Sequence, residues 1–131
     1  LAGTARALDD RAPDWLEGES VSLSHGNRAI EFAAGELTLY GIGDFPDGAG
    51  YAVIRAEEIV LSLGSPDGSA RNRFRGVVSE VATLGALTRV TVDVSGVPLV
   101  ASLTTRSAKE LELRDGTPVT ASFKAMAVHL C

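Results

Sequence analysis

Three short segments of the chain combine hydroxyls, cationic side chains and small residues in a pattern that suits anion binding. They are Ser69-Ala70-Arg71-Asn72, Thr104 with Ser107, and Lys124-Ala125. A tetrahedral dianion accepts hydrogen bonds and donates none, so a matching site holds only hydroxyls, backbone N–H groups and a few cations. Carboxylates must be absent, and the adjoining Glu110 can be occupied as a capping residue. The chemistry expected of the three segments together is the binding of a small oxyanion.

Each of these residues also has an ordinary structural role. The sequence from Ser107 to Glu110 matches a capping box, which predicts a short helix with Ser107 as its N-cap. For Thr104 the alternative is a strand-end residue, and for Lys124 it is a solvated surface lysine. For Ser69 and Arg71 the alternative is a linker that enters a strand, in which Arg71 pairs with an acidic neighbour. Taken singly, each structural role is the stronger interpretation, and only the combination indicates a ligand.

Composition excludes several classes of function. The formal net charge of −5 provides no positive field for nucleic acid, and the 5% aromatic content offers few rings on which bases could stack. No phosphate loop and no nucleophile with a nearby base is present, and His25 and His129 have no evident metal or catalytic partners, so we expect neither an enzyme nor a metal-ion site. No apolar run reaches membrane-spanning length. The one cysteine, Cys131, excludes an internal disulfide and fits a reducing compartment.

The elements that must position the three segments are β-strands. Hydrophobic residues make up 45% of the chain, and in the second half apolar and polar residues alternate, as in Val90, Val92 and Val94. A Pro- and Gly-containing stretch near position 66 divides the chain. We therefore predict an all-β protein of two small OB-like barrel lobes, residues 1–66 and 67–131, with one short helix after Ser107.

Two local patterns concern the third segment. Val119, Ala121 and Phe123 share one strand phase, whereas the apolar residues after Lys124-Ala125 follow the opposite phase. The change predicts a β-bulge or a bend there, and a bulge would leave backbone N–H groups available to an anion. In addition, residues 52–56 (AVIRA) align with residues 121–125 (ASFKA), which suggests a weak internal repeat.

Residues 69–130 resemble the molbindin family in order and spacing. The matching features are Ser-Ala-Arg-Asn, a strand with Gly76, Leu-Thr-x-x-Ser before Leu-x-Leu-x-x-Gly, and Phe-Lys-Ala. Molbindins are small OB-like (Mop/TOBE) domains that bind molybdate or tungstate at subunit or lobe interfaces. The resemblance implies that the oxyanion ligands are Ser69, Ala70, Arg71, Asn72, Thr104, Ser107, Lys124 and Ala125.

The first half departs from this pattern. It has no Ser-x-Arg-Asn and no Thr-x-x-Ser, and Glu57 and Glu58 follow Arg55, so we expect no matching ligand set there. Its sequence from Val53 to Ile59 is instead similar to the regulatory region that follows the ATPase domain in many ABC importers.

Together the two similarities imply a cytoplasmic regulatory domain of a molybdate/tungstate ABC importer, at the inner face of the membrane and separated from its ATPase domain. The expected partners are a second copy of the chain, that ATPase domain and the importer's membrane subunits. A start at Leu1 without a methionine also suggests a larger parent protein. The alternatives are a ligand-free TOBE regulatory domain of an importer for another solute and a free-standing molybdate-storage protein.

Overall fold

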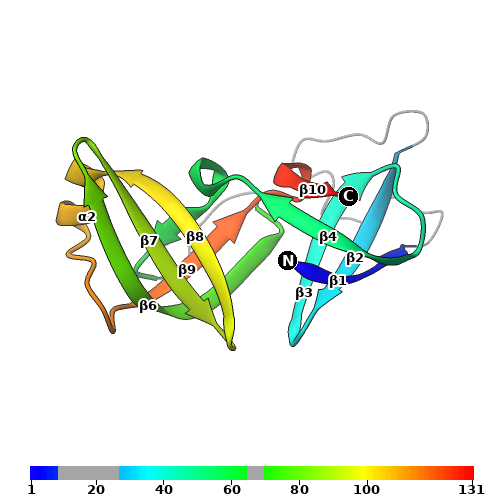
Figure 1. Cartoon of the computed structure of the whole chain (residues 1–131), viewed down its shortest axis with the longest axis horizontal. Coiled ribbons are helices and arrows are strands. Elements are labelled where there is room, and N and C mark those ends of the chain that lie inside the picture. Colours follow the sequence, from blue (N-terminus) through cyan, green and yellow to red (C-terminus); the bar gives the residue numbers. More distant parts are fainter. Residues whose placement is uncertain (9–26, 65–69) are drawn as a thin grey trace. The chain divides into compact units, whose positions relative to one another are not determined.

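The computed structural model describes residues 1–8, 27–64 and 70–131, and in this part of the chain the protein is built almost entirely of β-strands (Figure 1). Ser69 and His25 lie outside the described residues. The elements in chain order are β1 (Ala2–Ala7), β2 (Arg28–Ala34), β3 (Leu37–Gly43), β4 (Gly48–Ile54), the 3-10 turn η1 (Ala56–Glu58), β5 (Val60–Ser62), β6 (Asn72–Leu84), β7 (Leu87–Val94), β8 (Val97–Thr104), the helix α2 (Thr105–Glu110), β9 (Pro118–Phe123), the 3-10 turn η2 (Ala125–Ala127) and β10 (Val128–Leu130).

The strands form two five-stranded sheets. Their orders are β10-β4-β1-β2-β3 and β5-β9-β6-β7-β8, and the assigned pairings are antiparallel. Each sheet curls (Figure 1), and in the first of them β10 also lies against β3. The prediction of an all-β protein with two small barrel-like lobes is confirmed, and the described residues contain one short α-helix, α2.

Two compact units contain these sheets, and the chain passes between the units repeatedly. Unit 1 consists of Leu1–Ile54, Gly68–Asn72 and Phe123–Cys131, and unit 2 of Arg55–Asp67 and Arg73–Ser122. Because the fifth strand of each sheet comes from a distant part of the sequence, the units are not the continuous ranges 1–66 and 67–131. Pairing with a neighbouring strand satisfies the backbone N–H and C=O groups of a strand. Here β5 pairs with β9, and β10 pairs with β4.

The two sheets are repeats of one plan, with β1–β4 and β10 corresponding to β6–β9 and β5. The segments that leave β4 and β9 have the same geometry. Arg55 (φ −64°, ψ 138°) and Lys124 (φ −76°, ψ 152°) are both the extended residue before a 3-10 turn. In each turn the N–H of the following residue donates to the carbonyl of the first alanine, Ala56 or Ala125. The short sequence repeat therefore marks equivalent structural positions.

A glycine stands at the equivalent point of the first strand in both repeats. Thr4 pairs with Ala33 and Val77 pairs with Asp93, so the preceding Gly3 and Gly76 correspond. A Cβ atom on Gly3 would lie 2.1 Å from the Ala33 carbonyl oxygen, and one on Gly76 would lie 2.7 Å from the Asp93 carbonyl oxygen. Only glycine allows the backbones to approach this closely.

Most of the buried residues of each unit are aliphatic, and Phe32 and Phe123 are aromatic residues buried in unit 1. Ile30, Phe32 and Leu39 are fully buried in unit 1, and Val90 and Val92 are fully buried in unit 2. Strand β9 departs from simple alternation, because all five of its residues after Pro118 are buried. A strand covered on both faces cannot be recognised from an alternating pattern.

Candidate oxyanion-binding site

The first predicted segment is attached to β3 by the side chain of Asn72. Its Nδ2 donates to the Tyr40 carbonyl oxygen (2.9 Å) and its Oδ1 accepts from the Tyr40 N–H (2.8 Å). The side chain is 1% exposed, so it behaves as a piece of strand that pairs with the edge of β3. We therefore interpret Asn72 as a residue that positions its neighbours, with its carboxamide engaged by the protein itself.

Tyr40 also holds the neighbouring arginine. The Arg71 guanidinium carbon lies 4.5 Å from the centroid of the Tyr40 ring, a cation–π contact that stabilises by about 0.5–1 kcal/mol at an exposed site. One residue of β3 thus binds two consecutive residues of the Ser-Ala-Arg-Asn segment. Sequence reasoning missed Tyr40, because 32 residues separate it from Asn72 and no local pattern connects them.

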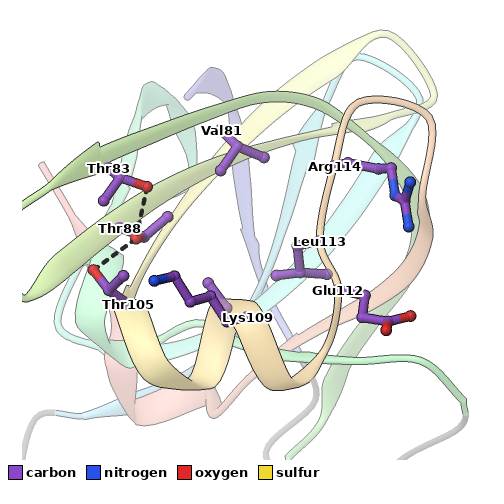
Figure 2. A pocket seen from close by; sticks show the side chains of 9 residues that line it. Val81, Thr83, Thr88, Thr105, Lys109, Glu112, Leu113 and Arg114 are labelled. Atoms are coloured by element: carbon purple, nitrogen blue, oxygen red, sulfur yellow. Dashed lines mark hydrogen bonds between the residues drawn. The ribbon is translucent and has the colours of Figure 1, made fainter.

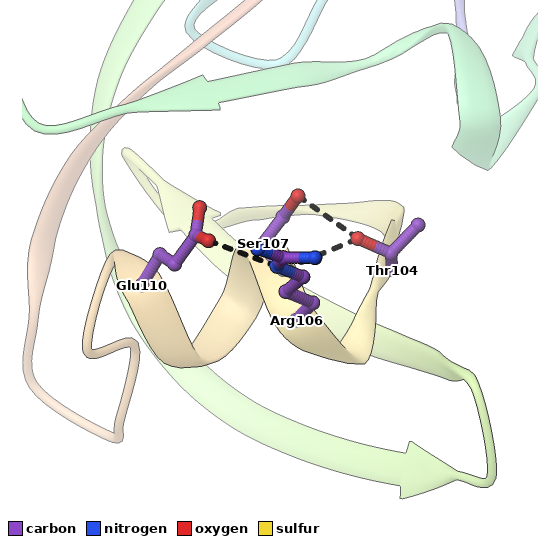
Figure 3. Close-up of polar contacts among 4 residues, drawn as sticks. All are labelled: Thr104, Arg106, Ser107 and Glu110. Atoms are coloured by element: carbon purple, nitrogen blue, oxygen red, sulfur yellow. Dashed lines mark hydrogen bonds and ion pairs between the residues drawn. The ribbon is translucent and has the colours of Figure 1, made fainter.

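The second predicted segment forms the N-terminus of α2, but its capping differs from the prediction. Thr104, not Ser107, is the N-cap: its Oγ1 accepts from the Ser107 N–H (3.1 Å) and donates to Ser107 Oγ (2.9 Å) (Figure 3). The helix starts one turn earlier than predicted because a threonine at a strand end has the extended backbone that an N-cap requires. Since Thr104 uses its proton on Ser107, the hydroxyl proton of Ser107 is the one directed away from the pair.

Glu110 has a different partner from the one expected. The predicted capping box would place its carboxylate on the helix N-terminus, whereas it forms an i,i+4 ion pair with Arg106 (3.2 Å) on the exposed side of α2 (Figure 3). The Arg106 guanidinium offsets the negative charge of the Glu110 carboxylate. The hydroxyls of Thr104 and Ser107 interact with each other at the first turn of the helix.

Thr104 as N-cap yields a testable stability difference. Replacing Thr104 by valine should lower the free energy of unfolding by about 1 kcal/mol, since the Ser107 N–H loses its acceptor. Thr104→Ser, which keeps the hydroxyl, is the matched control and should remain close to the parent protein. Urea denaturation of the three proteins measures the difference. A loss for serine with none for valine would show that methyl packing, not capping, sets the effect, because valine keeps the methyl group and serine keeps the hydroxyl.

The third predicted segment lies where β9 ends. Lys124 is exposed and precedes η2, and Ala125 is fully buried as the first residue of that turn. The expected β-bulge is a 3-10 turn: the Ala127 N–H donates to the Lys124 carbonyl oxygen (3.0 Å) and the chain then enters β10. A three-residue turn reverses the strand phase as a bulge would, which is why the periodicity alone could not separate the two.

The predicted residues fall into two groups. Unit 1 contains Ala70, Arg71 and Asn72 together with Lys124 and Ala125, so it brings the first and third segments into one compact body. Unit 2 contains the hydrogen-bonded pair, Thr104 and Ser107. Arg71 and Lys124 thus belong to unit 1, and the hydroxyls of Thr104 and Ser107 belong to unit 2.

The repeat relationship shows what stands at the position of Thr104 in the other half of the chain. Ala34 pairs with Leu37 and Val94 pairs with Val97 across equivalent two-residue turns, and counting along β3 and β8 aligns Asp44 with Thr104. Unit 1 then joins β3 to β4 through residues 44–47, without a helix. A carboxylate replaces the hydroxyl at this position.

Among the described residues, no group of three or more His, Cys, Asp or Glu side chains could hold a metal ion. The α-helix in the same ranges, α2, has six residues. No helix of the described residues is long and apolar enough to cross a membrane.

Comparison with known domain families gives a match that contains all three predicted segments. Residues 68–130 match the TOBE domain. The match covers the whole run from the Ser-Ala-Arg-Asn segment to β10 and agrees with the resemblance to Mop/TOBE domains noted in the sequence. The TOBE segment includes all eight residues implicated above.

Relatives of the chain in sequence are named as molybdate/tungstate or molybdenum transport proteins. The molybdate/tungstate import ATP-binding protein WtpC of Pyrococcus horikoshii is 42% identical over 77 residues, which are 59% of this chain and 22% of the relative. The molybdenum transport protein ModE of Herbaspirillum seropedicae is 44% identical over 63 residues, 47% of this chain and 23% of the relative. The chain thus spans less than a quarter of the length of these relatives.

Among solved structures, the cytoplasmic molybdate-binding protein ModG, crystallised with molybdate bound, superimposes with a TM-score of 0.79. The superposition covers 98% of this chain and 92% of ModG, at 23% sequence identity. This likeness establishes that the chain has the ModG fold.

Proposed function

We propose that the chain is a regulatory domain that binds molybdate or tungstate. The observation that carries the proposal is the identity to WtpC together with the position of the TOBE segment, which contains the complete set of predicted donors. The contacts described above support it: Arg71 is held against Tyr40 and the Ser107 hydroxyl is oriented by Thr104. Both arrangements fix hydrogen-bond donors before a ligand arrives, which lowers the entropic cost of binding.

The roles proposed for the residues follow from their chemistry. Arg71 and Lys124 supply positive charge, Ser107 supplies a hydroxyl proton, and the backbone around Ser69, Ala70 and Ala125 supplies N–H groups. Asn72 and Thr104 act through these donors by orienting them. The site takes a whole tetrahedral oxyanion as its ligand and coordinates no bare metal ion.

Calorimetric titration with molybdate, tungstate and sulfate tests the proposal. We expect binding of molybdate or tungstate, and a loss of at least about a hundredfold in affinity for Ser107→Ala combined with Lys124→Ala, because each removes a charged or charge-assisted hydrogen bond. The control combines Ser79→Ala with Arg89→Ala, which removes a hydroxyl and a cation from exposed positions of β6 and β7. Unchanged affinity in the Ser107/Lys124 variant would refute the site, and absence of binding to every oxyanion would favour a ligand-free TOBE domain.

The cellular setting forms part of the same proposal. Since WtpC is an import ATP-binding protein and the chain covers 22% of it, we infer a larger cytoplasmic parent whose ATPase domain couples to the membrane subunits of an importer. Bound oxyanion would stabilise one arrangement of a dimer of such chains and so modulate transport. ATPase measurements on the parent transporter, with and without molybdate, would reveal the coupling, and sedimentation of the chain would reveal self-association.

One observation favours a second candidate. The superposition covers 92% of ModG, so a chain of this extent corresponds to a whole free-standing molybdate-binding protein. In that case the chain stores or buffers the oxyanion without an ATPase. The size of the native protein detected in its own cells distinguishes the two candidates directly.

A further inference from the structure

The hydroxyl pair of the proposed oxyanion site is supported from within the TOBE segment. Thr105, the residue after Thr104, donates its hydroxyl proton to the Gly85 carbonyl oxygen (2.7 Å), and its N–H donates to the Ala86 carbonyl oxygen (2.8 Å). Its hydroxyl oxygen also lies 3.0 Å from that of Thr88, on a wall of the pocket between α2 and the β6–β7 hairpin (Figure 2). These residues all fall within 68–130, so the TOBE segment itself fixes the start of α2.

The two proposed cations are supported differently, because strand β3 lies beside both of the segments that carry them. Arg71 contacts Tyr40 of β3. Lys124 precedes the turn η2, which packs against β3, and all of these residues belong to unit 1. Strand β3 lies outside the TOBE segment, in the half of the chain for which the sequence predicts no ligand set. A strand without predicted ligands thus touches both of the segments that carry a cation.

Tyr40 holds the first segment through two different parts of the residue. Its backbone N–H and carbonyl oxygen bind the Asn72 carboxamide at 2.8 and 2.9 Å, and its ring lies 4.5 Å from the Arg71 guanidinium carbon, measured to the ring centroid. A ring face attracts a guanidinium without taking up its N–H donors or cancelling its charge, as a carboxylate would. The contact therefore restricts Arg71 and leaves its charge available to an anion.

Gly41, the next residue of β3, supports the third segment by its lack of a side chain. A Cβ atom there would lie 3.3 Å from Val128 Cγ1 and 3.4 Å from Val128 Cβ, so the valine packs directly on the glycine. Val128 is 2% exposed and follows η2. Within this turn the Ala127 N–H donates to the Lys124 carbonyl oxygen (3.0 Å), which links the backbone of the lysine to the position of the valine. The contact at Gly41 therefore sets how closely this segment approaches β3.

From these contacts we infer that β3 positions both cations of the oxyanion site: Tyr40 orients Arg71, and Gly41 sets where the backbone of Lys124 lies. This role rests on the proposed function and gives the first half of the chain a part in binding although it supplies no ligand. Long side chains lose rotamer freedom when they converge on one anion. Two adjacent residues of a single strand fix the backbones of both cations before the anion arrives, which lowers the entropic cost of binding.

Calorimetric titration of Tyr40 variants with molybdate and tungstate tests the first contact. Tyr40→Leu keeps the backbone bonds to Asn72 and removes the ring face, so we expect a loss of about two- to fivefold in affinity, the contribution of an exposed cation–π contact. Tyr40→Phe, which keeps the ring, should retain the affinity. Tyr51→Leu is the matched control, because Tyr51 is the other tyrosine of the chain, lies in β4 of unit 1 and is 60% exposed.

A second background shows whether Tyr40 acts through Arg71. In Arg71→Met, which lacks the charge, Tyr40→Leu should cause no further loss, because the effect of a positioning residue disappears with the group that it positions. Equal losses in both backgrounds, or no loss in the parent background, overturn the role of Tyr40. Absence of oxyanion binding by the parent chain overturns the proposed function as well, whereas binding that is unchanged in Tyr40→Leu overturns only the positioning role.

Gly41→Val tests the second contact. The added side chain displaces Val128 and with it the turn after Lys124, so affinity should fall about tenfold and no further than Lys124→Met lowers it. Gly41→Ala adds a single methyl group and should lower affinity less, in the same direction. Gly43→Val is the matched control, because a Cβ there would meet no atom within 4 Å. Urea denaturation establishes that each variant is folded, and folded Gly41 variants with the affinity of Gly43→Val overturn the role of Gly41.

Discussion

Replacing Asn72 by aspartate should destabilise the protein by about 2–4 kcal/mol at neutral pH and by much less near pH 4. The side chain is 1% exposed and makes both of its hydrogen bonds to the backbone of Tyr40. An ionised carboxylate there keeps the bond to the Tyr40 N–H but faces the Tyr40 carbonyl oxygen with a buried negative charge. A protonated carboxyl donates to that oxygen and restores both bonds.

The pH dependence follows from this difference. Burial raises the pKa of the introduced carboxyl in the folded state above its unfolded value of about 3.9. The stability supplied by the neutral form is therefore fully present below the unfolded pKa and is lost as the pH rises toward the folded pKa, by at most about 1.4 kcal/mol per pH unit. Urea denaturation of Asn72→Asp from pH 4 to pH 8, relative to the parent protein, measures the slope.

The chain offers one matched control for this substitution. Asn27 is the other asparagine and is exposed, so Asn27→Asp should show little loss and no added slope above about pH 5, where an exposed aspartate is ionised in both the folded and the unfolded state. A flat pH profile for Asn72→Asp, parallel to that of the control, would mean that the amide bridge to β3 does not hold in solution.

Adding a single methyl group to Gly3 or Gly76 should be the other severe change. Each substitution to alanine places a Cβ within 3 Å of a carbonyl oxygen of the neighbouring strand, that of Ala33 or Asp93. Neither oxygen can move without breaking the β1–β2 or β6–β7 ladder. We expect a loss of about 2–3 kcal/mol in the free energy of unfolding for each, the upper range for overpacking.

Gly43→Ala is the comparison that isolates the cause. Gly43 also lies in a strand, but a Cβ there would meet no atom within 4 Å. It should be neutral or slightly stabilising, because alanine loses less backbone entropy on folding than glycine does. Differential scanning calorimetry of the three variants decides the matter, and a similar melting temperature for all three would show that close strand approach is not what requires Gly3 and Gly76.

The repeat also bears on how many oxyanions a chain can hold. Arg55 matches Lys124 in backbone conformation, yet Asp44 matches Thr104, and residues 44–47, which make the connection equivalent to the one that contains α2, form no helix. A cation is retained while a hydroxyl becomes a carboxylate, which repels a dianion. This agrees with the expectation from the sequence that the first half lacks a matching ligand set, and it predicts one oxyanion per chain in calorimetry, where two would contradict it.

Much of the local structure was accessible from the sequence, because it depends on near neighbours. The alternation of Val90, Val92 and Val94 does correspond to a strand with one buried face, and all three are buried. The five-residue repeat did mark two strand ends of equal geometry, at Arg55 and Lys124. The order and spacing of the polar segments were sufficient to indicate the TOBE resemblance.

Other features required the tertiary structure, because they join residues far apart in the chain. No pattern around Asn72 reveals that its amide pairs with Tyr40, and none around Val60 or Val128 reveals that β5 and β10 complete sheets begun elsewhere. The N-cap of α2 was misassigned for a related reason: Thr104 and Ser107 are equally good caps by type, and the end of β8 decides between them.

The amino-acid sequence by itself thus determined the strand periodicity, the glycines and the donor chemistry, all of which reside in single residues or short runs. Only the folded chain decided which strands share a sheet and which side chains orient Arg71 and Ser107. The physical reason is that hydrogen bonds and close packing between distant segments depend on where the backbone returns, and that position is a property of the whole fold.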